Sequence, residues 1–198
     1  MSASDLRVGD DGLARCGWVG DDAEYRRYHD EEWGFPLHGD RALFEKLSLE
    51  GFQAGLSWIT ILRRRPTFRA AFREFDIDAV AAFDETDIAR LLADAGIIRN
   101  RAKVEATISN ARITRELIAG DPGALDRLVW SFAPTARRNR PRGFAELPAV
   151  TPEATALSAA LKKLGYRFVG PTTMYALMQS AGLVDDHLEG CWRAPESG

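Results

Sequence analysis

Glu50-Gly51-Phe52-Gln53-Ala54-Gly55-Leu56-Ser57-Trp58 is the stretch of sequence that decides the fold. The residues before it have the spacing of an amphipathic helix, with Asp40 as the expected N-cap. The apolar face of that helix consists of Leu43, Phe44, Leu47 and Leu49. Ser57 stands where it can cap a second helix that begins at Trp58. The stretch therefore predicts a junction between two helices.

Glu50 lies at the end of the apolar face, so the first helix carries a carboxylate toward the interior. Burying such a carboxylate is costly unless a partner stabilises it. Gly51 and Gly55 allow the backbone to approach another molecule closely. Together with Trp58, these residues suit a pocket for a flat ring with polar edges. The alternative is a tight turn between two core helices, with Glu50 in solvent.

Length and charge narrow the class of protein. The 198 residues suffice for one domain or two small lobes, and a net charge of -3 does not by itself require a polyanionic partner, although a local basic face could bind one. No apolar run is long enough to span a bilayer, and residues 1–12 lack the apolar core of a signal peptide. We therefore expect a flexible leader at residues 1–14 and a cytosolic protein, in which structural disulfides are disfavoured.

Aromatic residues are dense just after that leader. Residues 22–30 have the pattern of a short helix, in which Tyr25 and Tyr28 share one face. Trp18 precedes this helix and Trp33 follows it. These rings could form a wall on which another ring stacks. They could equally cap the core, because Trp and Tyr usually bury their rings and find one polar partner.

The rest of the chain also predicts helices. A helix over residues 58–65 is followed by further helices that end before Gly96, then by a long helix to about residue 119. Two more helices, over 151–164 and 171–181, follow a loop at 133–150 that is rich in arginine. The residues expected to open or cap helices in the middle of the chain are Pro66, Asp76, and Asp84 or Thr86. No stretch has the alternation of strands, so we predict an all-α fold.

The turn around Gly96 brings basic residues to the start of the long helix. Arg99 and Arg101 lie there, and a helix N-terminus offers free N–H groups and a positive dipole end. Such a corner can hold a phosphate. A plain helical hairpin with solvated basic residues is the alternative.

Cysteine and histidine residues form two pairs far apart in the sequence. His187 and Cys191 lie four residues apart, and Cys16 lies near His29. Two thiolates and two imidazoles suit a closed, tetrahedral structural zinc site, which would join the two ends of the ordered chain and add to its stability. The alternative is two buried thiols and two ordinary histidines.

Several motifs resemble those of the 3-methyladenine DNA glycosylase I family of bacterial repair enzymes, from about Arg15 to Trp192. The motifs are Arg15-Cys16-Gly17-Trp18, Tyr28-His29-Asp30, Glu32-Trp33-Gly34, Leu49-Glu50-Gly51, Gln53-Ala54-Gly55-Leu56-Ser57-Trp58-Ile59-Thr60, Asp94-Ala95-Gly96-Ile97-Ile98-Arg99, Val129-Trp130-Ser131-Phe132, Phe168-Val169-Gly170 and Gly182-Leu183-Val184-Asp185-Asp186-His187. The resemblance implies a helix-hairpin-helix glycosylase domain over residues 15–192, with the hairpin lobe at about 57–132, a second lobe from 15–56 and 133–192, and a tail at 193–198.

The resemblance also assigns roles. It implies zinc on Cys16, His29, His187 and Cys191, and a base pocket lined by Trp18, Tyr25, Tyr28, Glu50 and Trp58. DNA would be gripped by the hairpin around Gly96, Arg99 and Arg101, while Gly55 and Leu56 approach the gap left by the extruded base. Glu50, ionised, would accept hydrogen bonds from the base. The family lacks the catalytic aspartate of other helix-hairpin-helix glycosylases, so we nominate no catalytic aspartate in this chain.

The activity that the resemblance implies is base excision. The enzyme would extrude N3-methyladenine from alkylated double-stranded DNA, hydrolyse its glycosidic bond, and release free 3-methyladenine, leaving an abasic site. We expect a monomer that acts at the bacterial nucleoid in the cytoplasm. Two other functions stay open: a helix-hairpin-helix module that only binds DNA, and a zinc hydrolase, which would need an open position on its metal.

Overall fold

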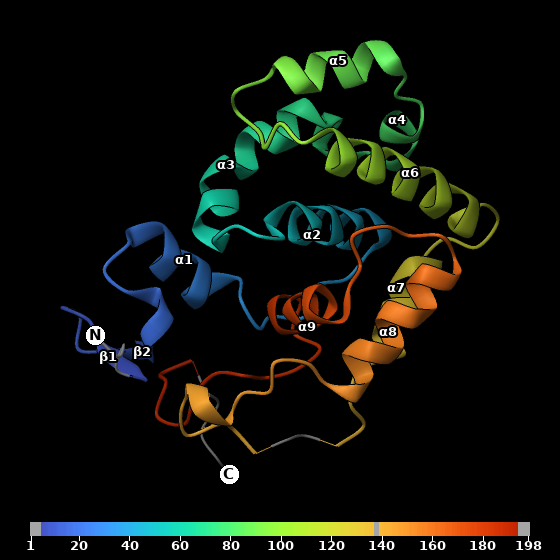
Figure 1. Ribbon diagram of the computed structural model, residues 1–198. Coiled ribbons are helices and arrows are strands. Elements are labelled where there is room, and N and C mark those ends of the chain that lie inside the picture. The colour runs from blue at the N-terminus through green and yellow to red at the C-terminus, as the bar shows by residue number, and fades with distance from the viewer. Residues whose placement is uncertain (1–4, 137–138, 194–198) are drawn as a thin grey trace.

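The structure, a computed structural model, describes residues 5–136 and 139–193 and is mostly helical (Figure 1). Its α-helices are α1 Ala23–Glu31, α2 Asp40–Gln53, α3 Trp58–Ala71, α4 Ile77–Ala81, α5 Glu85–Ala93, α6 Arg101–Ile118, α7 Ala124–Trp130, α8 Pro152–Lys163 and α9 Pro171–Ser180. The short 3-10 helices are η1 Gly17–Val19, η2 Arg73–Phe75 and η3 Phe144–Glu146. Within the described ranges, no helix combines the length and apolarity needed to cross a bilayer.

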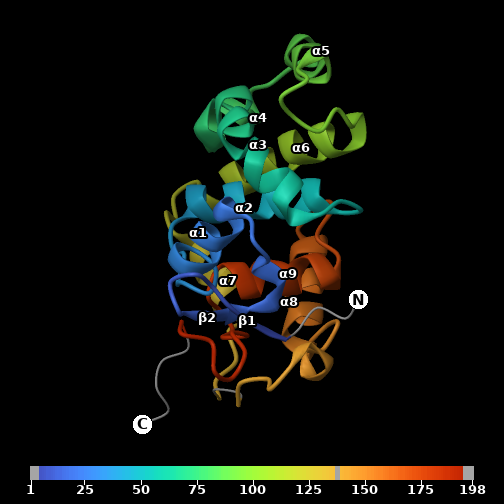
Figure 2. The same cartoon turned by 90° about the vertical axis from the view of Figure 1, so that its left-hand side faces the viewer.

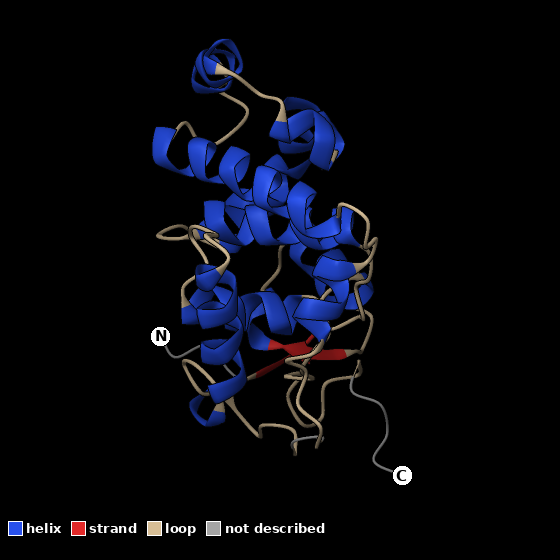
Figure 3. Ribbon diagram, turned by 90° about the vertical axis from the view of Figure 1, so that its right-hand side faces the viewer, coloured by secondary structure: helices blue, strands red, loops and turns tan. Residues whose placement is uncertain are grey.

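A small β-sheet corrects the prediction of a purely helical fold. Strands β1 Leu6–Val8 and β2 Ala14–Cys16 pair antiparallel, with Arg7 opposite Arg15 (Figure 3). The prediction of a flexible leader at residues 1–14 is therefore wrong for residues 5–14, while residues 1–4 lie outside the described part. The hairpin is closed by the Arg15 guanidinium, which donates to Asp11 and to Asp30 of α1. Strands of three residues are too short to show an alternating pattern.

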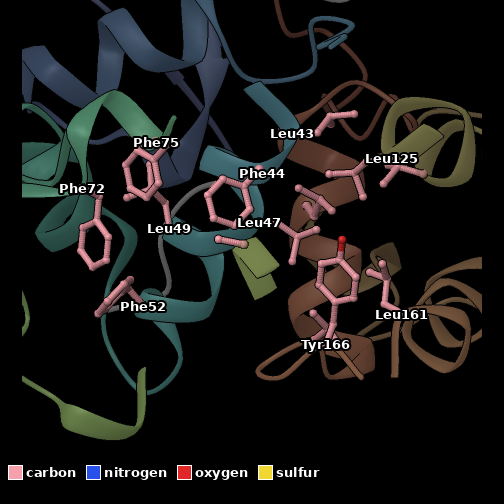
Figure 4. Packing of buried hydrophobic residues seen from close by; sticks show 14 of the residues in the cluster. Leu43, Phe44, Leu47, Leu49, Phe52, Phe72, Phe75, Leu125, Leu161 and Tyr166 are labelled. Atoms are coloured by element: carbon pink, nitrogen blue, oxygen red, sulfur yellow. The ribbon is translucent and has the colours of Figure 1, made fainter. Parts of the chain in front are cut away.

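Helix α2 lies at the centre of the molecule. It contacts α3, α6, α7 and α9, with α3 to α6 on one side of it and α7 to α9 on the other (Figures 1 and 2). Its side chains meet Phe72 and Phe75 on one side and Leu125 and Tyr166 on the other (Figure 4). Because α2 is buried nearly all round, its C-terminal turn brings Glu50 into the interior. The lobe boundaries near residues 57 and 132 stay a prediction.

Helix boundaries follow local capping in most places. Asp76 caps α4, and Asp84 forms a capping box with Asp87 at α5. Ser57 occupies the N-cap of α3, although its hydroxyl contacts Thr60 Oγ1 rather than a backbone N–H. We expected one helix to end at Arg65 and Pro66 to open the next. This is wrong, because α3 continues through Pro66 to Ala71. Buried side chains lie on both sides of the proline, Ile61 and Leu62 before it and Phe68 after it, and anchor α3 in the core.

Asp40 caps a different helix from the one we expected. Gly39, with φ 95°, is the N-cap of α2, and Asp40 is its first residue. The Asp40 carboxylate accepts hydrogen bonds from Gly123 N (2.6 Å) and Asp126 N (3.1 Å) at the start of α7. Asp40 therefore joins the N-termini of two helices that are distant in sequence.

We expect Asp40→Ala to lower the free energy of unfolding by about 1–2 kcal/mol, because the N-terminal N–H groups of α7 lose their acceptor. Urea unfolding followed by circular dichroism measures this loss. Asp10→Ala, at an exposed aspartate in the β1–β2 turn, is the control and should change stability little. Equal stability of the two variants would contradict the bridging role of Asp40.

Candidate functional site

A cavity of about 520 Å³ opens where α1, the end of α2, the start of α3 and α9 meet. All five side chains of the expected pocket line it: Trp18, Tyr25, Tyr28, Glu50 and Trp58. Its lining also includes Trp33, Gln53, Ser57, Phe144, Leu147, Ala176, Gln179, Ser180 and Asp186. A larger cavity of about 770 Å³ lies between residues 33–36 and 182–187, but neither Glu50 nor Trp58 lines it. The smaller cavity is therefore the candidate site.

Two acids line this cavity, Glu50 and Asp186, and Glu50 is the one that the sequence predicts. Only 3% of its surface is exposed, so the alternative of a solvated Glu50 at a tight turn is wrong. Burial raises the pKa of Glu50 to about 7, although the charge of Lys46 and a hydrogen bond from Ser180 Oγ (2.9 Å) act in the opposite direction. Glu50 therefore gains or loses its charge near neutral pH, as is typical of carboxyl groups in functional sites.

Aromatic rings form the wall of the cavity. The Tyr28 and Trp58 ring centroids lie 5.6 Å apart with a 43° tilt, and Trp18 meets Tyr25 edge-on at 5.4 Å. The Tyr25 hydroxyl accepts a hydrogen bond from Ile59 N (3.0 Å), which fixes the ring against the start of α3. The indole Nε1 of Trp58 is buried and has no partner among the described atoms. This unpaired donor is an exception to the rule that buried polar groups find hydrogen-bond partners.

Three residues beside Glu50 were missed by sequence reasoning. Lys46 is buried, and its Nζ lies 3.3 Å from the Tyr28 hydroxyl. Its spacing of four residues before Glu50 is the signal that could have found it. Ser180 and Asp186 arrive from α9 and the segment after it. No local pattern marks these two, because their partners lie far away in sequence.

The two cysteine–histidine pairs meet in one buried cluster. Within the described ranges, the donor atoms of Cys16, His29, His187 and Cys191 all lie within 4.8 Å of one another. Cys191 Sγ is 3.4 Å from His29 Nε2 and 3.6 Å from His187 Nδ1. Asp30, which is itself held by Arg15, contacts the other nitrogen of His29 at 2.8 Å. A carboxylate behind a histidine in this way is typical of metal sites.

The chemistry of these donors fits a divalent cation. A hydrogen bond between the two thiols lowers the pKa of Cys191 and raises that of Cys16. A cation bound between them would stabilise both as thiolates. Two sulfurs and two imidazole nitrogens make the tetrahedral donor set that zinc prefers.

The residues expected at DNA lie in two exposed loops. Gly55, with φ 82°, and Leu56, 41% exposed, join α2 to α3. Lys103 of α6, which we did not assign, holds this loop by donating to Phe52 O (2.8 Å) and Ala54 O (2.6 Å). The loop and the hairpin around α6 are therefore one connected unit.

The hairpin around Gly96 differs from expectation in two details. The Gly96 N–H is not free, because it donates to Asp94 Oδ1 (2.7 Å). Arg101 forms ion pairs with Glu85 and Glu105. Arg99 is exposed, and Asn100 caps α6 through Lys103 N.

The arginine-rich loop at 133–150 is largely paired where it is described. Arg140 contacts Asp185 (2.9 Å) and Arg142 contacts Glu146 (2.8 Å). Arg137 and Arg138 lie outside the described residues. The described arginines of this loop thus have acidic partners within the protein.

Comparison with known proteins places the chain in one family. Residues 18–194 match the methyladenine glycosylase family. The chain is 47% identical to DNA-3-methyladenine glycosylase 1 of Escherichia coli (strain K12) over 180 residues, which cover 90% of this chain and 96% of that protein.

Solved structures agree with this similarity. A crystal structure of a 3-methyladenine DNA glycosylase I superposes with a TM-score of 0.87 at 46% identity, covering 91% of this chain and all (100%) of that one. The Staphylococcus aureus 3-methyladenine DNA glycosylase I, solved to explain 3-methyladenine recognition, superposes with a TM-score of 0.85 at 34% identity, covering 93% of this chain and 98% of that one. With its buried acid, its ring wall and its cysteine–histidine cluster in place, this chain belongs to the methyladenine glycosylase family.

Proposed function

We propose that this protein excises N3-methyladenine from alkylated DNA as a monofunctional DNA-3-methyladenine glycosylase. The observation that carries the proposal is Glu50, a buried carboxylate placed beside the Tyr28 and Trp58 rings in a cavity large enough for a purine. The relatives named DNA-3-methyladenine glycosylase support the same reaction.

The cavity selects the damaged base by charge. A base in a duplex must first be extruded into a pocket. N3-methyladenine carries a positive charge, and Glu50, ionised, accepts hydrogen bonds from its amino edge. Attraction between a desolvated cation and an aromatic ring is worth about 2 kcal/mol, and intact adenine gains none of it.

The reaction needs little help from the protein. The methylated base leaves as a neutral molecule with the electrons of the glycosidic bond, so the bond is already weak. Water adds to the anomeric carbon of the sugar and loses a proton to solvent, which leaves an abasic site. Lys46 does not line the cavity, so no lysine is offered there for a Schiff base. Incubating the protein with methylated DNA and identifying the released bases tests the proposal; release of no 3-methyladenine would refute it.

The cysteine–histidine cluster holds a structural zinc in this proposal. Cys16, His29, His187 and Cys191 would fill all four positions, which leaves none for substrate or water. Bound zinc would supply cross-linking between the N- and C-terminal segments rather than catalysis. The zinc-hydrolase alternative needs an open position and is therefore disfavoured.

DNA contact comes from the two loops that Lys103 connects. Leu56, next to Gly55, enters the gap left by the extruded base, while Gly96, Arg99, Arg101 and the N-terminus of α6 grip the phosphates. Arg101 would exchange its partners Glu85 and Glu105 for phosphate. We propose a monomer that acts on the bacterial chromosome in the cytoplasm.

We expect Leu56→Ala to reduce excision from duplex DNA by about tenfold. The variant loses apolar contact between the Leu56 side chain and the DNA, which contributes roughly 1–2 kcal/mol. Binding of free 3-methyladenine, followed by tryptophan fluorescence, should not change. Leu164→Ala is the matched control, since Leu164 is 42% exposed and Leu56 41%. Equal excision by the two variants would refute the role of Leu56.

A further inference from the structure

Lys46 places an ammonium group directly behind the ring wall. Its side chain is 8% exposed, and its Nζ lies 5.1 Å from the centroid of the Tyr28 ring and 5.3 Å from that of the Trp58 ring. It lies one helical turn before Glu50 on α2, so the two side chains are neighbours. A buried ammonium group is costly, and burial lowers the pKa of Lys46.

The contact between Lys46 and Tyr28 determines where the Tyr28 hydroxyl proton points. An ammonium group only donates hydrogen bonds, so the Tyr28 oxygen accepts from Nζ at 3.3 Å. The Tyr28 hydroxyl proton must then point away from Lys46. The Tyr28 hydroxyl also has a hydrogen bond with Ser180, and both residues line the cavity, so its proton points to the side where a base would bind.

The charge of Lys46 also acts on Glu50. Among the described residues, Ser180 Oγ is the hydrogen-bond donor to the Glu50 carboxylate, on Oε1. Lys46 adds the opposite charge that opposes the effect of burial on the pKa of Glu50. The other titratable or charged groups around this pair are Tyr28 and Glu32 near α1, Glu45 on α2, Arg65 on α3 and Asp186 after α9. Glu32 and Arg65 pair with each other and largely cancel.

We infer that Lys46 is a positioning residue of the base pocket, whose buried positive charge favours the ionised form of Glu50 and turns the Tyr28 hydroxyl toward the cavity. The inference rests on the proposed function for its meaning in catalysis. It explains why a costly buried cation stands next to a pocket for a cationic base: the pocket must hold its negative charge before the base arrives. Lys46 touches no reacting atom and acts through Glu50 and Tyr28.

The test is the pH dependence of kcat/KM for 3-methyladenine release, which reports the pKa of Glu50 in the free enzyme. Without the nearby positive charge, the pKa of Glu50 rises further, so activity is lost at a higher pH as the pH falls. We expect the acid midpoint of Lys46→Met to move up by about one pH unit. Lys46→Gln, which keeps a donor for Tyr28, should move the midpoint equally but retain more activity at about pH 8.

Controls separate this effect from a structural one. Lys163→Met removes the same charge from an exposed site on α8 and should leave the midpoint unchanged. Circular dichroism checks the fold, and Lys46→Gln carries the test if Lys46→Met does not fold. A ¹³C NMR titration of the glutamate carboxyl groups, with Glu50 assigned by Glu50→Gln, reads the same midpoint without substrate.

The outcomes are distinguishable. If the wild-type protein releases 3-methyladenine but neither Lys46 variant shifts the midpoint, the inference is wrong and the proposed function stands. If the wild-type protein releases no base, the proposed function is wrong, and the NMR titration alone decides whether Lys46 sets the charge of Glu50.

Discussion

Replacement of Glu50 by Gln is expected to slow excision of 3-methyladenine by about 100- to 1,000-fold, the range observed when one preorganised electrostatic contact is removed from an active site. Gln has nearly the same shape and can still accept one hydrogen bond, so the loss reports the missing negative charge. The effect should be large because Glu50 is 3% exposed and its charge is poorly screened by solvent. Single-turnover release from methylated duplex DNA measures it.

The pH profile identifies Glu50 as the group responsible. Because burial raises the pKa of Glu50 to about 7, the wild-type protein should lose about tenfold in kcat/KM for each pH unit below that value, as the carboxylate becomes protonated. Glu50→Gln cannot titrate and should give a flat profile over the same range. Glu116→Gln, at an exposed position on α6, should behave as wild type. Wild-type rates in Glu50→Gln would remove Glu50 from the mechanism.

Replacement of His187 by Asn is expected to release the metal and to lower Tm by about 8–16 °C. Loss of one ligand from a closed zinc site removes a cross-link between distant segments, for which we estimate about 4 kcal/mol, and each kcal/mol lowers Tm by about 2–4 °C in a chain of this size. Inductively coupled plasma mass spectrometry gives the metal content, and differential scanning fluorimetry gives Tm.

The third histidine provides the matched control for this metal site. His38 is 61% exposed and lies outside the cluster, where it contacts Asp126. His38→Asn should therefore keep a full complement of zinc. A wild-type Tm for His187→Asn would exclude a stabilising metal. If the metal-free protein kept its fold but lost all activity, zinc would take part in catalysis, as in the zinc-hydrolase alternative.

The sequence predicts features that depend on neighbouring residues. Asp76 and Asp84 cap α4 and α5 as expected, because a cap bonds to N–H groups two or three residues away. Asp40 misled us, since the N–H groups that donate to its carboxylate lie at the start of α7, more than 80 residues along the chain. Pro66 also misled us, because α3 buries side chains both before and after it, and this burial outweighs the local cost of the proline.

The functional site also contains residues that the sequence predicts and residues that only the folded structure brings together. Glu50 and Trp58 could be chosen from sequence, because one motif joins an acid, glycines and an aromatic residue. Tyr28 could be chosen from the aromatic-rich helix near the N-terminus. The buried position of Lys46 and its contact with Tyr28 could not, since lysine on a helix is usually solvated. Ser180 lies 130 residues from Glu50 and reaches it only through the packing of α9 on α2.

The cysteine–histidine cluster has a consequence for how the protein is made. Cys16 and His29 cannot complete the cluster before His187 and Cys191 have been synthesised. The C-terminal segment also donates a hydrogen bond to the N-terminal one, from Trp192 N to Ala14 O (2.8 Å). Chains are synthesised from the N-terminus, and domains often begin to fold before synthesis ends. We therefore expect the N-terminal segment to reach its final position only after Cys191 has been synthesised. Because Trp18 lines the pocket and lies two residues after Cys16, we expect the pocket wall to be completed at the same late stage.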